Sequence, residues 1–190
     1  MDAMLDLETY GIRPGAALRS VGLVTFVPGR PAEGGETFYA NILESSCLSS
    51  GLQKEQGTVD WWAKQDRAAQ DALLVNPRPL FDVVLAVENF VYLKAVKCVW
   101  AQGANFDPIL WEAACRAVGR EAPWRFFNVR DTRTLYDAAV FDPRSIARAG
   151  TYHNALDDAR HQVACLQAAW ARILDPAHAA SRYDPPAKKV

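Results

Sequence analysis

The sequence has no long apolar run, no excess of basic residues and no closely spaced cysteines. No segment approaches the roughly 18 apolar residues that a membrane helix needs, so we expect no membrane partner. Lys and Arg number 21 against 22 Asp and Glu, and the formal net charge is −1. This balance argues against broad electrostatic binding of nucleic acid, so any phosphate would have to be held locally.

The four cysteines are scattered and form no CxxC pair. This pattern predicts neither a zinc site nor a disulfide framework, and it favours reduced thiols in the cytoplasm. What the chain does contain is the composition of an ordinary globular protein, with 50% hydrophobic and 23% charged residues among 190. We expect one domain over residues 1–175 and a proline-containing tail over residues 176–190.

The order of apolar patterns predicts an α/β fold with a mixed sheet. Three strands joined by short turns are expected to form an antiparallel meander at the start of the chain. The pattern then changes to helices that alternate with short strands, which completes an α/β plan. The expected strands are residues 3–8, 17–27, 36–42, 98–103 and 124–129, and the expected helices begin near Thr58 and Pro79 or span 108–118, 133–139 and 154–174.

Two carboxylates, Asp6 and Glu8, stand two residues apart at the end of the first predicted strand. Residues i and i+2 of a strand share a face, so both acids should point to one spot while Leu5 and Leu7 face the opposite side. Taken alone the pattern is weak, because many surface strands carry two solvated acids. If the pair is buried, two like charges so close together need a compensating charge.

Two further acids follow at places where a strand meets a helix or a helix begins. Asp107 lies in a turn between a strand and a helix, where ligands of open α/β sheets usually bind, although an Asp before Pro108 by itself favours a helix N-cap. Asp158 lies beside the apolar stripe of the last helix, whereas Asp157 points nearly opposite. His153 precedes that helix and can reach the same pocket. A charged first turn that complements the helix dipole is the competing interpretation.

Four acids placed at these positions could sit together only if a divalent cation compensated their charge. Oxygen ligands suit Mg²⁺ or Mn²⁺ rather than zinc. The sequence therefore predicts a hard-cation site formed by Asp6, Glu8, Asp107 and Asp158. His161 is expected to be an ordinary surface histidine.

These acids resemble the motif set of the DEDDh superfamily of 3′→5′ exonucleases. The motifs are Asp6-Leu-Glu8, Asp107 and His153-x4-Asp158. The stretches DLETYGIRPGAALRSVG, TVDWWAKQ, NVRDTRTLYD and YHNALDDARHQ are similar to one branch, the exonuclease VIII-like group known from a mycobacterial exoribonuclease. The similarity covers residues 6 to about 170. It implies a ribonuclease H-like fold, with a five-stranded mixed sheet flanked by helices, and release of nucleoside monophosphates from the 3′ end of RNA or DNA, single-stranded or with a 3′ overhang.

The resemblance also implies roles for individual residues. Two Mg²⁺ or Mn²⁺ ions would be held by Asp6, Glu8, Asp107 and Asp158, with Asp6 bridging both and His153 as general base. Thr9 and Tyr10 would meet the terminal sugar and base. Asp131 is expected to cap a helix rather than to serve as a fifth ligand.

Trp61 and Trp62 are neighbours on a predicted helix, about 100° apart around its axis. We expect one to be buried and the other, with Gln65, to line the substrate groove, and we take Trp62 as the groove residue. Burial of both rings in the core is the competing interpretation.

Other functions stay open at this point. The chain could be a catalytically inactive ribonuclease H-like module that binds nucleic acid, although the complete acidic set and His153 weigh against it. A ribonuclease H-type endonuclease would share the metal geometry but is disfavoured by the His-x4-Asp motif. No residue marks a contact to the 2′-hydroxyl, so the sequence does not choose between RNA and DNA. Aromatic residues over 59–65 are compatible with a homodimer.

Overall fold

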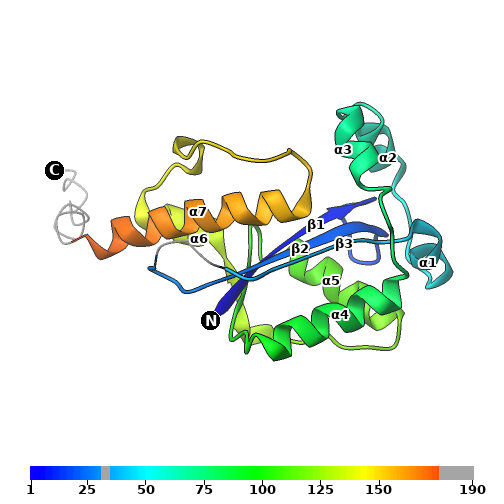
Figure 1. The fold of residues 1–190 in the computed structure, drawn as a ribbon, viewed down its shortest axis with the longest axis horizontal. Coiled ribbons are helices and arrows are strands. Elements are labelled where there is room, and N and C mark those ends of the chain that lie inside the picture. Colours follow the sequence, from blue (N-terminus) through cyan, green and yellow to red (C-terminus); the bar gives the residue numbers. More distant parts are fainter. Residues whose placement is uncertain (31–34, 176–190) are drawn as a thin grey trace, which may run out of the picture.

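The computed structural model describes residues 1–30 and 35–175, and the predicted tail over 176–190 lies outside these ranges. Within them a five-stranded sheet lies between two layers of helices (Figure 1). The strand order is β3-β2-β1-β4-β5, with antiparallel pairing on one side of β1 and parallel pairing on the other. The predicted α/β class and mixed sheet are therefore confirmed.

The elements follow one another in the order that the apolar patterns indicated. The strands are β1 (Asp2–Thr9), β2 (Leu18–Phe26), β3 (Thr37–Asn41), β4 (Val99–Ala101) and β5 (Val129–Asp131). The helices are α1 (Glu44–Ser49), α2 (Gln56–Trp62), α3 (Arg67–Ala72), α4 (Leu80–Leu93), α5 (Asp107–Ala117), α6 (Thr132–Ala139) and α7 (Ala155–Leu174), with short 3₁₀ turns η1 (Phe126–Asn128) and η2 (Pro143–Ser145). None of the helices in the described ranges combines the length and apolarity that a bilayer crossing requires.

The central strand β1 alternates between two hydrophobic cores. Leu5 and Leu7 pack in the core beneath α4 and α5, whereas Met4 packs in the core beneath α6 and α7 (Figure 1). Because the period of a strand is two residues, Asp6 and Glu8 continue the face of Met4 toward α7. The two acids therefore stand where the apolar core of that face ends.

Two predicted boundaries differ from the structure, and two helices were not predicted. The first expected helix begins at Gln56 rather than near Thr58. The helices α1 and α3 were not predicted, because six residues are too few for a helical period to show. The fifth strand begins at Val129, and the 3₁₀ turn η1 occupies the expected segment, where Phe126 and Phe127 are exposed. Aromatic residues favour strands where they pack on a half-buried sheet face, whereas these two rings contact each other and lie largely in solvent.

A glycine on β2 allows the start of α7 to approach the sheet closely. Gly22 lies opposite Asp6 in the β1–β2 register. A Cβ added at Gly22 would stand 2.3 Å from the carbonyl oxygen of Ala155, the first residue of α7. The backbones of β2 and α7 are therefore in contact at this point, and the first turn of α7 is held over the end of β1.

Replacing Gly22 with Ala should therefore be strongly destabilising. A methyl group forced against backbone that cannot turn away costs about 3 kcal/mol, and for a chain of this size that lowers Tm by roughly 10 °C. Thermal denaturation would measure the change. Gly57→Ala is the matched control, because its added Cβ meets open space. A Gly22→Ala protein that melts with the wild type would contradict the close approach.

Candidate metal centre

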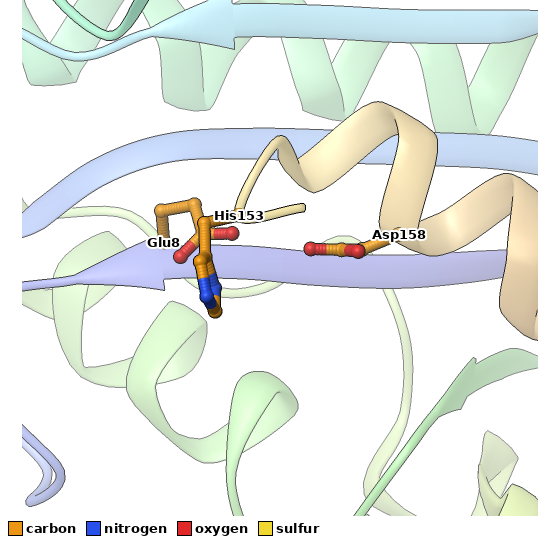
Figure 2. A group of neighbouring side chains, drawn as sticks. All are labelled: Glu8, His153 and Asp158. Carbon is orange, nitrogen blue, oxygen red and sulfur yellow. The ribbon is translucent and has the colours of Figure 1, made fainter. Parts of the chain in front are cut away.

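Three side chains from distant parts of the chain meet at the carboxyl end of β1. Glu8, His153 and Asp158 each offer a ligand atom, and these atoms lie within 4.8 Å of one another (Figure 2). Glu8 comes from β1, His153 from the loop before α7, and Asp158 from the first turn of α7. Asp157 faces away, because its carboxylate accepts a hydrogen bond from the backbone N–H of Thr151 at 2.9 Å. The predicted inward orientation of Asp158 is confirmed.

Asp6 lies beside this group in a polar cavity of about 330 Å³ that Asp158 and His153 also line. Its Oδ1 accepts a hydrogen bond of 2.6 Å from Nε2 of Gln162, a residue one turn after Asp158 on α7. The opposite atom of that amide, Oε1 of Gln162, is buried and has no partner among the described residues. This arrangement orients Asp6 and leaves a buried acceptor without a partner among the described residues beside it.

Asp107 reaches the same acids from the start of α5. The local prediction that it caps this helix is wrong, because α5 begins at Asp107 itself and follows Phe106. Its carboxylate turns back to β1 and accepts a hydrogen bond of 3.1 Å from the backbone N–H of Leu7. The interaction fixes Asp107 next to the two acids of β1, and its charge acts on both.

Burial and mutual repulsion make the charged state of these acids unfavourable. Burial, and then the charges of Asp107 and Glu8, hold the pKa of Asp6 well above its ordinary range. Burial raises the pKa of Glu8 to about 8, with a further contribution from Asp107. Burial also raises the pKa of Asp107 to about 7. The protein therefore concentrates carboxylates where its own residues do not fully compensate them.

His153 occupies a strained position at the edge of the cluster. Its φ of 62° is left-handed, a conformation that costs a non-glycine residue about 1–2 kcal/mol. Its ring contacts Trp61 and Trp62 edge to face, with centroids 4.9 and 5.7 Å away. Burial and the charge of Arg148 lower the pKa of His153, which favours the neutral imidazole at pH 7. A backbone strain of this kind is characteristic of functional sites.

A second, mostly apolar cavity of about 340 Å³ adjoins Glu8 on the other side of the cluster. Thr9, Trp61 and Trp62 line it. Trp62 is 3% exposed, and its Nε1 donates a hydrogen bond of 2.8 Å to the carbonyl of Thr9, whereas Trp61 is 43% exposed. The unequal burial of the two rings is confirmed, but Trp62, which we took as the groove residue, is the buried ring and Trp61 is the exposed one. Both line this cavity, and a role of Trp62 in substrate binding stays a prediction.

Two predicted substrate-binding residues lie elsewhere. The ring of Tyr10 packs against the guanidinium of Arg19 and the ammonium of Lys54 rather than lining the apolar cavity. Gln65 donates a hydrogen bond of 3.0 Å to the carbonyl of Trp61, so it stabilises the end of α2. Neither contact tests a role in substrate binding, and both assignments stay predictions.

Asp131 caps α6, as predicted, and also bonds to the loop that precedes Asp107. Its Oδ1 accepts from the backbone N–H of Arg133 at 2.7 Å, and its Oδ2 accepts from the N–H of Ala104 at 2.7 Å. Ala104 belongs to the loop that leads into Asp107. Asp131 therefore joins α6 to the loop that positions this ligand candidate.

Several residues of the polar cavity were not predicted from the sequence, among them Arg148, His161 and Gln162. His161 was expected at the surface but lines the cavity and lies 3.5 Å from Sγ of Cys165. His161 and Gln162 follow Asp158 by three and four residues, so helical spacing could have placed them on the same face. Arg148 lies in a loop, where no periodic signal exists.

The residues present suit a hard divalent cation. The donors are four carboxylates, with the Oε1 of Gln162 buried beside Asp6 and lacking a partner among the described residues. Raised pKa values of Asp6, Glu8 and Asp107 mean that added positive charge would be favourable there. Oxygen donors of this kind are the ligands that Mg²⁺ and Mn²⁺ prefer.

The strand order and the acids at the end of β1 are those of a ribonuclease H-like fold that carries the DEDDh motif set. Over residues 1–170 the sequence matches the family model described as the 3'-5' exoribonuclease Rv2179c-like domain, and the chain belongs to this family. The predicted mycobacterial exoribonuclease-like branch is therefore confirmed. Membership indicates a hydrolase with 3′→5′ exoribonuclease activity. No curated protein matches the sequence significantly.

Proposed function

We propose that the chain is a metal-dependent exonuclease that removes nucleoside monophosphates one at a time from the 3′ end of RNA. The observation that carries the proposal is the convergence of the buried acids and His153 beside an apolar cavity edged by an exposed Trp61. The family match supports the direction of cleavage and the preference for RNA.

The acids would hold two Mg²⁺ or Mn²⁺ ions. The proposed ligands are Asp6, Glu8, Asp107 and Asp158. When bound, such ions supply a water of lowered pKa and neutralise charge that develops on the phosphate and on the leaving 3′ oxygen. Gln162 holds Asp6 in orientation, and the Leu7 N–H does the same for Asp107.

His153 is the proposed general base. A base must be unprotonated to accept a proton from water, and the lowered pKa of His153 favours that state at neutral pH. The two tryptophan rings restrict the imidazole, which lies beside Glu8 (Figure 2) with a ring nitrogen within 4.8 Å of a carboxylate oxygen of Glu8 and of Asp158. The side chain is therefore held in place before substrate arrives.

His153→Asn is the variant that separates chemistry from folding. Asn tolerates the left-handed region, so the loop should keep its shape. We expect kcat to fall about 10²- to 10⁴-fold, with Tm and Mn²⁺ affinity close to the wild-type values. In the wild type, kcat/KM should rise with pH and level off, with a midpoint below the ordinary histidine value of about 6.5, and the variant should lose this rise. A variant within about threefold of the wild-type rate would contradict the role.

The apolar cavity is the proposed site of the terminal nucleotide. Its volume of about 340 Å³ lies within the range of small-molecule sites. Trp61 offers an exposed ring to a base, and Thr9 continues directly from Glu8 along β1. A base in this cavity would bring its phosphate toward the acids.

Trp61→Ala and Trp62→Ala should have different effects. Base stacking is worth about 1–3 kcal/mol, so Trp61→Ala should raise KM about tenfold or more and lower Tm much less than Trp62→Ala does. Trp62→Ala removes a buried ring and should lower the free energy of unfolding by about 3–5 kcal/mol. Trp61→Phe keeps a ring and should restore most of the affinity. Equal effects of the two Ala variants on Tm would contradict the assignment.

A degradation assay tests the proposal directly. Matched RNA and DNA oligonucleotides labelled at the 5′ end would be incubated with Mg²⁺, Mn²⁺ or EDTA. We expect a ladder that shortens by single nucleotides with either metal and no change in EDTA. An endonuclease would instead release long internal fragments, and an inactive binding module would shorten nothing. Faster loss of RNA than of DNA would indicate a contact to the 2′-hydroxyl.

A further inference from the structure

Arg148 occupies the polar cavity in the position of a counter-ion. It lies in the loop between η2 and α7, and its Nη2 forms an ion pair with Oδ1 of Asp158. Its guanidinium also stacks on the ring of Tyr152, with 4.1 Å to the centroid. Only 18% of the side chain is exposed, so solvent screens its charge poorly.

The charge of Arg148 acts on four titratable groups in or beside the cavity. It favours the charged forms of Asp6 and Glu8, and it disfavours protonation of His153 and His161. The other nearby arginines act on single members of the acidic group. Arg19 acts on Glu8, and Arg133 acts on Asp107. Arg144 also lines the cavity, but it pairs with Asp142, so Arg148 is the arginine whose charge acts on several of these groups.

The ion pair conflicts with the proposed function of Asp158. A metal ion on Asp158 and a guanidinium at Oδ1 of the same carboxylate would repel each other and compete for that oxygen. A metal that binds through Oδ1 would therefore displace the guanidinium. Arg148 itself lines the cavity of about 330 Å³, which offers space into which the displaced side chain can turn.

A displaced guanidinium would have a new partner once substrate binds. Its planar fork matches a phosphate bidentately, and a charge-assisted pair of this kind is stronger than a neutral hydrogen bond. Neither Nε nor Nη2 of Arg148 has a hydrogen-bond partner among the described residues, so donors of the guanidinium are free to bind another group. The net charge of −1 makes local phosphate contacts of this kind the expected means of holding a nucleic acid.

We propose that Arg148 neutralises Asp158 in the metal-free protein, yields that carboxylate to the metal, and then binds a phosphate of the nucleic acid. This inference rests on the proposed function. Arg148 is then a substrate-binding residue that forms an ion pair with Asp158 until the metal binds.

The first test measures Mn²⁺ binding without nucleic acid, by loss of the free-ion EPR signal on titration. Arg148→Ala and the bulkier Arg148→Gln should bind Mn²⁺ about tenfold more tightly than the wild type, because the competing cation is gone. Arg148→Lys keeps the charge and should stay within about threefold. Arg160→Ala is the matched control, because Arg160 pairs at 3.1 Å with the outward-facing Asp157, and both residues lie on α7. The Mn²⁺ affinity of this variant should equal that of the wild type.

The second test measures exonuclease kinetics at saturating Mn²⁺. KM of both neutral variants should rise about tenfold through loss of a charge-assisted contact, and Arg148→Lys should fall between them and the wild type. Unchanged Mn²⁺ affinity in both neutral variants overturns the inference, and unchanged KM overturns the phosphate contact. Failure of the wild type to bind Mn²⁺ would instead refute the proposed function itself.

Discussion

Asp158→Asn should reduce nucleotide release at least about 10³-fold while leaving the fold intact. A metal ion contributes several kcal/mol to charge stabilisation in a phosphoryl displacement, and each 1.36 kcal/mol corresponds to a tenfold change in rate. Asn has nearly the shape of Asp, so α7 should still pack on β1 and β2 as it does in the wild type. Mn²⁺ binding should weaken in parallel with the rate.

Asp157→Asn is the matched control for this change. Asp157 is the adjacent residue, but its carboxylate accepts from the Thr151 N–H outside the acidic group. An Asn at this position can still accept that hydrogen bond, so the rate should stay within about threefold of the wild type. Comparable losses in both variants, or wild-type release by Asp158→Asn, would contradict the metal-ligand role.

The metal-free protein should become less stable as the pH rises from 5 to 8. The pKa of Glu8 is about 8 in the folded protein against 4.5 in the unfolded chain, and that of Asp107 is about 7 against 3.8. Between these values the folded state binds more protons than the unfolded state, so the free energy of unfolding falls with rising pH. At 1.36 kcal/mol for each pKa unit, the loss should reach several kcal/mol, or on the order of 10 °C in Tm.

Thermal denaturation in EDTA at pH 5, 6, 7 and 8 would measure this slope, and Mn²⁺ added at pH 8 should restore the lost stability. Glu8→Gln removes one of the raised carboxyl groups and should flatten the slope. Glu121→Gln makes the same change at an exposed position and should leave the slope as it is. A Tm in EDTA that rises steadily between pH 5 and 8 would contradict the unfavourable charging of the acids.

The periodic parts of the site could be predicted from the sequence. The two-residue period of β1 places Asp6 and Glu8 on one face, and the apolar stripe of α7 separates Asp158 from Asp157. The role of Asp107 was harder to predict, because its neighbours in sequence suggest a helix N-cap. Only the packing of α5 against β1 brings its carboxylate to the backbone N–H of Leu7.

The remaining parts depend on contacts that no local pattern encodes. Arg148 reaches Asp158 from an irregular loop, so neither spacing nor propensity indicates its direction. The two tryptophans show the same limit, since the helical angle predicts unequal burial but not which ring is buried. The hydrogen bond from Trp62 to the carbonyl of Thr9 decides that choice, and it joins residues 53 apart in sequence.

The contact at Gly22 also bears on how the family can vary. At Gly22 the backbone of β2 contacts the backbone of α7 directly. The distance between the acids of β1 and Asp158 therefore does not depend on the size of a side chain at this point. Apolar residues farther along α7 can change size, and the helix can tilt about this fixed point to accommodate them. The residues that fill the hydrophobic interior can therefore change while the contact at Gly22 keeps the distance between the carboxylates.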